Sequence, residues 1–299
     1  MQLIVYYIVY LFCWLLALLP LRVLYALSNC LYVILYYIIQ YRKKIVFENL
    51  RNSFLEKSPE EIKIIAKKFY RHLADLFMEI LKMVNFDLEK LSKRVKYTNP
   101  EVLDELYHQG KDVAVALGHY GNWEWLQGLS ASHKHLPLII YKPISNKYFE
   151  RVFYRMRRKM NVVPIQMRRI IRAILKYRQE GVLTITAFVS DQSTIWEETQ
   201  YWTTFLNQET PVYLGIEKIA TSLKQAVIFY KLTKPKRGYY EVEILKLFDD
   251  ASKTNPYEIT KKHTEILEEI IKEKPELWLW THRRWKLKNR KAREDAEKN

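Results

Sequence analysis

The stretch Asp112-Val113-Ala114-Val115-Ala116-Leu117-Gly118-His119-Tyr120-Gly121-Asn122-Trp123-Glu124 decides the fold of this chain. Its first half is an unbroken apolar run of strand length, which is typical of a strand buried on both faces of a parallel sheet. His119 follows where this run ends through a glycine, and Glu124 lies five residues further on. Open α/β sheets bind ligands at the carboxyl ends of their strands. The pattern therefore predicts His119 at the rim of a crevice.

Further strands and helices alternate along the rest of the chain. Hydrophobic periodicity predicts strands over 136–141, 162–165, 182–189, 226–233 and 239–246, and helices over 59–82, 100–109, 146–160, 168–179, 212–223 and 256–273. This alternation predicts an α/β fold with a mixed, largely parallel central sheet and helices on both faces. His119, Lys142 and Asp191 all follow predicted strands, so we expect them at one edge of the sheet and around one crevice.

The first forty residues are apolar, and Arg22 is the only charge before Arg42-Lys43-Lys44. Roughly 20 apolar residues span a bilayer as a helix, and the segment lacks the basic start and cleavage site of a signal peptide. The sequence predicts a membrane anchor over 1–40, with a spanning helix at 3–21 followed by an interfacial helix at 23–39. A pair of buried core helices is the alternative. The basic cluster favours the cytoplasmic side for the residues that follow.

The net charge of +16 in 299 residues indicates anionic partners. Anionic lipid headgroups and an acidic carrier protein both fit, while nucleic acid has only charge in its favour, since no zinc-finger spacing or phosphate-binding glycine loop is present. His133 and His135 have no evident third ligand, so no metal site is predicted. Cys13 and Cys30 both lie in the apolar N-terminal region, which suits a reducing compartment for the remainder.

Three blocks of sequence resemble one family. The blocks are the motif His119-x-Gly121-Asn122-Trp123-Glu124, the segment Arg42 to Phe54 with Asn49-Leu50-Arg51-Asn52-Ser53-Phe54, and the closing stretch Pro275-Glu276-Leu277-Trp278-Leu279-Trp280-Thr281-His282-Arg283-Arg284-Trp285-Lys286. They resemble the late (lauroyl/myristoyl-type) acyltransferases of lipid A biosynthesis. These belong to the His-x4-Asp/Glu acyltransferase superfamily. The resemblance implies a glycerolphosphate-acyltransferase-like domain over 41–288, followed by a charged tail at 289–299. It also implies an inner-membrane location, with the catalytic domain on the cytoplasmic side.

The His-x4-Glu spacing suits acyl transfer to a hydroxyl group. His119 is expected to act as general base, and the carboxylate of Glu124, brought back by a turn, is expected to orient the imidazole and stabilise its charged form. No Gly-x-Ser-x-Gly nucleophile motif is present. Direct attack by the acceptor is thus favoured over an acyl-enzyme, and no cofactor is expected.

Candidate binding residues surround this pair. Backbone amides after Gly121, the side chain of Asn122 or an arginine are alternatives for stabilising the oxyanion. Arg157 and Arg158 lie where the family carries a functional arginine, although a solvated helix face explains them equally well. Asp191 resembles the acid of the family's Pro-Asp-Gln stretch, with a helix N-cap as the alternative. Here Ser190 replaces the proline.

The closing motif supplies a last group of candidates. His282, Arg283 and Arg284 suit a phosphate or carboxylate headgroup, because arginine binds phosphate through two parallel hydrogen bonds. A structural role at the membrane face is the alternative.

The sequence thus predicts a membrane-anchored O-acyltransferase. The resemblance implies acyl-acyl carrier protein as donor and a hydroxyacyl group of a lipid A precursor as acceptor. Another membrane lipid, such as a glycerophospholipid or an aminoacyl lipid, is the alternative acceptor. A non-catalytic, basic membrane-associated binding protein is the alternative from a different functional class.

Overall fold

The buried strand of the opening stretch lies in the middle of a seven-stranded sheet with the order β1-β9-β8-β2-β5-β3-β4. The computed structural model describes residues 2–143, 147–288 and 290–291. The strands are β1 (Val95–Tyr97), β2 (Val113–Leu117), β3 (Leu136–Tyr141), β4 (Val163–Gln166), β5 (Thr184–Val189), β8 (Ala226–Lys236) and β9 (Tyr239–Phe248). Only β8 and β9 pair antiparallel within this sheet. The predicted α/β fold with a largely parallel sheet is confirmed.

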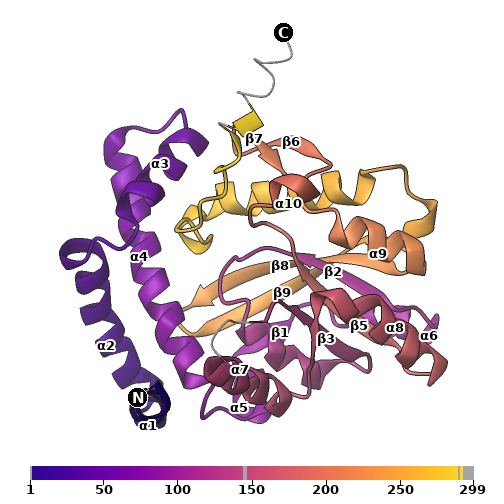
Figure 1. Ribbon diagram of the computed structural model, residues 1–299, viewed down its shortest axis with the longest axis horizontal. Coiled ribbons are helices and arrows are strands. Elements are labelled where there is room, and N and C mark those ends of the chain that lie inside the picture. The colour runs from indigo at the N-terminus through magenta and orange to yellow at the C-terminus, as the bar shows by residue number, and fades with distance from the viewer. Residues whose placement is uncertain (1, 144–146, 289, 292–299) are drawn as a thin grey trace.

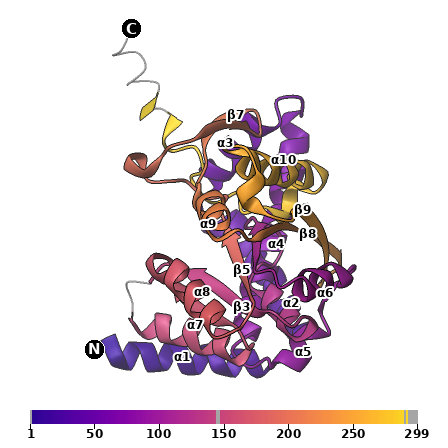
Figure 2. The same ribbon diagram turned by 90° about the vertical axis from the view of Figure 1, so that its right-hand side faces the viewer.

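Helices cover both faces of the sheet (Figures 1 and 2). One face carries α8 (Ile170–Gln179), α9 (Gly215–Leu223) and α10 (Glu258–Glu273). The opposite face carries the 3-10 helix η2 (Trp125–Ser132) and α7 (Lys147–Lys159). The helix α6 (Glu101–His108) precedes β2, and the short α5 (Leu88–Ser92) precedes β1. The connection from β2 passes over β5 to reach β3, so the chain changes direction beside the strand that carries His119.

The helix α4 (Pro59–Lys82) begins and ends where the periodicity predicts. Ser58 caps it by accepting from the backbone N–H of Glu61, while the Glu61 carboxylate accepts from the backbone N–H of Ser58. This reciprocal capping box satisfies two backbone donors that a helix start otherwise leaves free. The start of the helix is therefore encoded locally.

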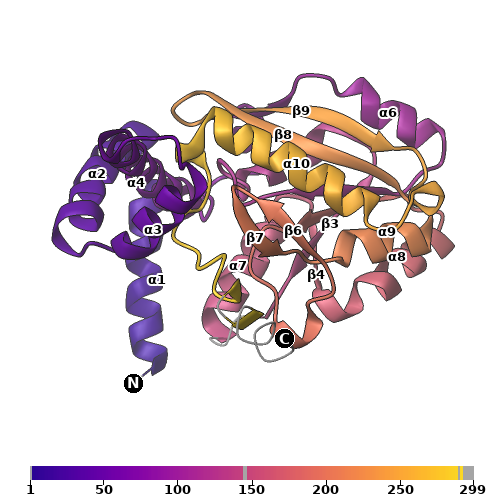
Figure 3. The same ribbon diagram turned by 90° about the horizontal axis from the view of Figure 1, so that it is seen from above.

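The N-terminal segment forms two successive helices close to the predicted 3–21 and 23–39. It forms α1 (Gln2–Leu18), α2 (Leu21–Val33) and a π-helical continuation (Ile34–Ile38). Among the described residues, the helix that is long and apolar enough to cross a membrane is Leu21–Ile38 rather than 3–21. The 17 described residues of α1 are at the lower limit of spanning length, so which of the two helices spans the membrane stays a prediction. Figure 3 shows α1 projecting from the body, whereas α2 packs along α4.

A small hairpin, β6 (Trp202–Phe205) and β7 (Gln208–Pro211), was not predicted from the sequence. Its two-residue turn places Leu206 and Asn207 at positive φ, 51° and 60°. Two-residue hairpin turns usually contain an Asn-Gly or Asp-Gly pair, which is absent here. The helix α3 (Lys43–Ser53) was not predicted either. The predicted tail at 289–299 lies outside the described residues, apart from residues 290 and 291.

Candidate active site

The sheet register brings His119 and Asp191 together. Leu117 pairs with Val189 across the parallel strands β2 and β5. His119 and Asp191 each come two residues later, so the two side chains stand at the same level beyond the carboxyl edge. His119 Nδ1 lies 2.6 Å from Asp191 Oδ1, and the backbone N–H of His119 donates to Asp191 Oδ2 over 2.9 Å. Two adjacent strands thus build a histidine–carboxylate dyad.

The Asp191 carboxylate is held ionised at the base of the site. Its side chain is 3 % exposed, against 18 % for His119. Trp278 Nε1 donates to Asp191 Oδ2 over 2.7 Å. Burial by itself raises the pKa of Asp191, but the imidazole of His119 and the donated hydrogen bonds outweigh burial and lower that pKa to about 2. Asp191 therefore accepts the Nδ1 proton and leaves Nε2 of His119 as the basic nitrogen.

The expectation that Glu124 orients His119 is wrong. Glu124 Oε1 accepts from Arg157 Nη2 over 3.0 Å, and its Oε2 accepts from Gln127 Nε2 over 2.8 Å. The physical reason is the path of the chain after Gly121: the Oδ1 of Asn122 accepts from the backbone N–H of Trp125 and starts η2 there. That short helix directs Glu124 toward α7 instead of back to the imidazole.

The second ring nitrogen of His119, Nε2, lies at a cavity. Gln192 Nε2 lies 3.1 Å from His119 Nε2, and the ring of Trp123 packs edge-on against the imidazole with centroids 4.9 Å apart. Gln192 was missed as a site residue, although it follows Asp191 directly at the end of the same strand. Its amide occupies the position from which a substrate hydroxyl would reach the base.

The cavity has a volume of about 390 Å³ and lies between η2, α7 and one face of the sheet. His119, Glu124, Arg157 and Gln192 supply its polar groups near the carboxyl edge, and Val189, Ala187 and Ile185 of β5 line it toward the sheet interior. The four residue-to-residue steps between Ile185 and Val189 correspond to a depth of roughly 13 Å. An apolar slot with a few polar groups at one end suits a chain of hydrocarbon that carries a reactive head.

The backbone N–H of Gly121 and the side chain of Asn122 do not offer groups to a substrate. Asn122 is 0 % exposed, and its Nδ2 donates to Glu79 while its Oδ1 is taken by Trp125. The backbone N–H of Gly121 donates to the carbonyl of Leu277. Gly121 has φ +60°, and a Cβ there would lie 2.2 Å from Leu232. Both residues shape the turn that carries His119, so the Asn122 side chain is not available to an oxyanion, while a role of the backbone amides after Gly121 stays a prediction.

The structure places the two candidate arginines of α7 in different surroundings. Arg157 lines the cavity, with its guanidinium fixed by Glu124, whereas Arg158 is exposed and does not line it. For Arg158, the solvated helix face is the better explanation.

The closing motif packs beneath the dyad. Leu277 and Leu279 pair by backbone hydrogen bonds with Gly121 and His119, and Trp278 reaches Asp191 between them. His282 Nε2 accepts from the backbone N–H of Ser193 over 3.0 Å. Most of this motif therefore supports the catalytic turn and the Asp191 loop. Trp278 is a site residue that sequence analysis missed, because the motif alone did not show what its indole contacts.

Burial sets the electrostatics of two further motif residues. It lowers the pKa of His282 to about 4 and that of Arg284 to about 10. Arg284 is 2 % exposed and donates to the carbonyl of Pro211. A headgroup cannot reach this buried guanidinium, so the binding role expected for Arg284 is wrong. Arg283 is exposed.

The family-like segment that contains Asn49 is hydrogen-bonded to the closing stretch. Asn49 Nδ2 of α3 donates to the carbonyls of Trp280 and His282, over 2.9 and 3.0 Å. The three blocks, far apart in sequence, are thus connected: Asn49 binds the closing stretch, and the closing stretch pairs with the turn that carries His119. Among the residues that the structure describes, no three His, Cys, Asp or Glu side chains gather closely enough to hold a metal ion.

The fold and the site together define a class: an α/β enzyme with a histidine–carboxylate dyad at the mouth of an apolar slot. Residues 1–287 match the family model of bacterial lipid A biosynthesis acyltransferases, and the chain belongs to that family. It is therefore an acyltransferase, and the non-catalytic alternative no longer applies. No curated protein matches the sequence.

Proposed function

We propose that this acyltransferase moves a fatty acyl chain from acyl-acyl carrier protein to a hydroxyacyl group of a lipid A precursor. The observation that carries this proposal is the Nε2 of His119 at the mouth of an apolar slot, with Nδ1 of the same ring held by an ionised carboxylate. The family restricts the chemistry to acyl transfer in lipid A biosynthesis. The donor, the acceptor atom and the residue roles are our proposal, and the geometry of the site supports them.

The reaction proceeds by direct attack. Nε2 of His119 removes the proton of the acceptor hydroxyl as its oxygen bonds to the thioester carbonyl carbon, giving a tetrahedral oxyanion. Asp191 stabilises the resulting imidazolium through Nδ1–H. When the C–S bond breaks, the thiolate leaves and takes the proton from Nε2–H, which restores the neutral base. The acceptor hydroxyl must first displace the Gln192 amide from Nε2.

Arg157 is our candidate for stabilising the oxyanion. Its guanidinium lies on the cavity wall and is oriented by the Glu124 carboxylate over 3.0 Å. A cation held in this way is preorganised for the charge that develops on the thioester oxygen. The acid of the His-x4-Glu motif then acts through Arg157 rather than through the imidazole.

The acceptor approaches from the membrane side. The hairpin loop at the end of β8 lies at the same sheet edge as His119 and contacts α2 through Arg237. Exposed apolar side chains cover the outer face of this helix and its continuation, namely Val23, Leu27, Val33, Ile34 and Ile38. Insertion of this face in the inner membrane, with Arg42-Lys43-Lys44 at the cytoplasmic boundary, brings the crevice to the lipid surface.

A four-way assay tests donor and acceptor. Purified protein is supplied with lauroyl-acyl carrier protein or lauroyl-CoA, each with a lipid A precursor or a glycerophospholipid. We expect the highest kcat/KM for the carrier-bound chain and the lipid A precursor. Equal use of the coenzyme A thioester would contradict the proposed donor. Preferred acylation of the glycerophospholipid would contradict the proposed acceptor.

A further inference from the structure

Glu79 of α4 is a buried acid that the reaction does not use. From its contacts we infer that Glu79 is a positioning residue, which holds the turn carrying His119 through Asn122. This inference rests on the proposed role of His119 as general base. It assigns a third acid to the site, beside Asp191 and Glu124, on a helix that belongs to neither catalytic strand.

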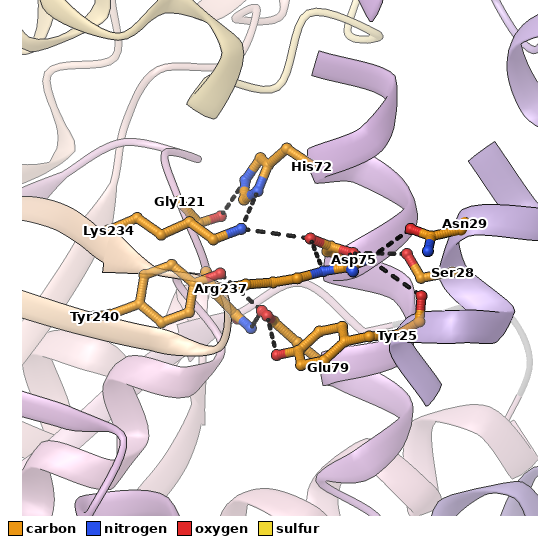
Figure 4. A network of polar contacts seen from close by, with 11 residues as sticks. Tyr25, Ser28, Asn29, His72, Asp75, Glu79, Gly121, Lys234, Arg237 and Tyr240 are labelled. Atoms are coloured by element: carbon orange, nitrogen blue, oxygen red, sulfur yellow. Dashed lines mark hydrogen bonds and ion pairs between the residues drawn. The ribbon is translucent and has the colours of Figure 1, made fainter. Parts of the chain in front are cut away.

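The carboxylate of Glu79 is 0 % exposed and accepts from three neutral donors (Figure 4). Tyr25 of α2 donates to Oε1 over 2.8 Å, while Asn122 Nδ2 and Tyr240 of β9 each donate to Oε2 over 2.7 Å. The backbone carbonyl of Glu79 accepts from Trp125 Nε1 over 2.9 Å. One residue of α4 is therefore bonded to the start of η2 twice, by side chain and by backbone.

The same helix contacts the turn one position earlier. His72 Nε2 lies 3.3 Å from the carbonyl of Gly121, and its Nδ1 lies 3.3 Å from Lys234 Nζ. Lys234 and Arg237 also pair with Asp75 between the two residues. Because Gly121 and Asn122 follow His119 by two and three residues, α4 fixes the backbone that sets the imidazole above Asp191.

Polarity makes the Glu79–Asn122 contact specific. The Oδ1 of Asn122 already accepts from Trp125, so Asn122 can only donate toward Glu79. A buried donor facing another donor, or an acceptor facing another acceptor, loses its hydrogen bond and keeps the full cost of desolvation. Exchanging donor for acceptor in only one of the two side chains should thus displace the turn. Exchanging the roles in both side chains should restore it.

A double-mutant cycle uses this polarity. Asn122→Asp sets a second carboxylate against Glu79, and the turn must move to separate them. We expect kcat for acyl transfer to fall by about 10²-fold, as for a catalytic group displaced by about 1 Å. KM for the acyl donor should stay within about twofold, since the apolar slot is untouched. Adding Glu79→Gln gives the new carboxylate an N–H donor and restores a donor–acceptor pair, so kcat should recover toward that of wild type.

Tyr25→Phe is the matched control. It removes a donor to the same carboxylate, but from α2 and not from the catalytic turn. We expect a lower melting temperature and an unchanged kcat, which separates positioning from general support of the fold.

Three results would overturn the inference: an unchanged kcat for Asn122→Asp, no recovery in the double variant, or an equal loss of kcat in Tyr25→Phe. His119→Ala, measured alongside, keeps the two proposals apart. If His119→Ala remains active, the proposed general base is wrong. If His119→Ala is inactive while the double-mutant cycle gives one of these three results, only the positioning role of Glu79 is wrong.

Discussion

At the residue scale, the chemistry depends on which acid faces which partner. Asp191, 72 positions from His119, binds the imidazole, whereas Glu124, only five positions away, binds Arg157. The sequence predicted both His119 and Asp191 at one sheet edge, because both follow strands. It could not predict their pairing, which depends on the alignment of Leu117 with Val189. Spacing along the chain shows nearby partners and not those across a sheet.

Substitutions of Asp191 and of Glu124 should therefore lower kcat for different reasons. Asp191→Asn replaces the acceptor of the Nδ1 proton by an amide that favours the wrong tautomer. We expect kcat to fall by about 10²–10⁴-fold and the acidic limb of the kcat–pH profile to shift, because the imidazolium loses its counter-charge. A profile identical to wild type would contradict the dyad.

Loss of the second acid should act through Arg157. For Glu124→Gln and Arg157→Lys we expect similar losses of about 10²–10³-fold in kcat, the range for one oxyanion donor. Their pH profiles should keep the wild-type shape. The double variant tests the coupling: if its loss equals the product of the two single losses, Glu124 and Arg157 do not act as a unit.

At the scale of elements, local signals and distant contacts contribute differently. The bounds of α4 and β3 could be predicted from periodicity and capping, because these signals lie within the segments. The hairpin β6–β7 could not, since its turn contains no glycine. The function of α3 could not either, because its buried asparagine contacts carbonyls more than 230 positions away.

That contact gives a prediction for α3. Asn49→Ala leaves the carbonyls of Trp280 and His282 without this donor, and we expect about 1–3 kcal/mol of lost stability. Asn52→Ala on the same helix is the control, because Asn52 is exposed. Thermal unfolding of both variants checks this. Equal melting temperatures would show that Asn49 does not tie the two family-like blocks together.

At the scale of the whole molecule, the charge of +16 is available for docking an acidic carrier. Arg168, Arg169 and Arg172 are exposed at the start of α8. Reversing all three to Glu should raise KM for acyl-acyl carrier protein more than it lowers kcat, and moderate salt should weaken docking to wild type, since exposed charges are screened beyond about 8–10 Å.

The control is a reversal of equal charge elsewhere: Lys253, Lys261 and Lys262, also exposed, are changed to Glu. If both triple variants raise KM equally, net charge and not the α8 surface governs docking. If KM changes neither with salt nor in the two triple variants, the carrier protein does not dock through electrostatic attraction.

Acid should destabilise the whole fold. Burial lowers the pKa of His72 to about 3 and those of His133, His263 and His282 to about 4. In the unfolded chain, histidine titrates near 6.5. Between about pH 6.5 and 4 the unfolded chain thus binds more protons than the folded one, so stability falls as pH falls. The contribution of Asp191, whose pKa is about 2, is lost only below this window.

Melting temperatures between pH 7.5 and 4.5 check this prediction. We expect a steady decrease on acidification, and a shallower one for His263→Gln, which removes one of the four groups. A melting temperature that is constant or rises toward pH 4.5 would contradict it.

The measurement that tests the central claim most directly is acyl transfer by purified His119→Ala, followed by mass spectrometry of the lipid product. With acyl-acyl carrier protein and a lipid A precursor, wild type should add the mass of one acyl chain. His119→Ala should remain folded and membrane-bound, with turnover lowered by about 10²–10⁴-fold or more. Turnover near wild type in a folded His119→Ala protein would contradict the assignment of His119 as the general base.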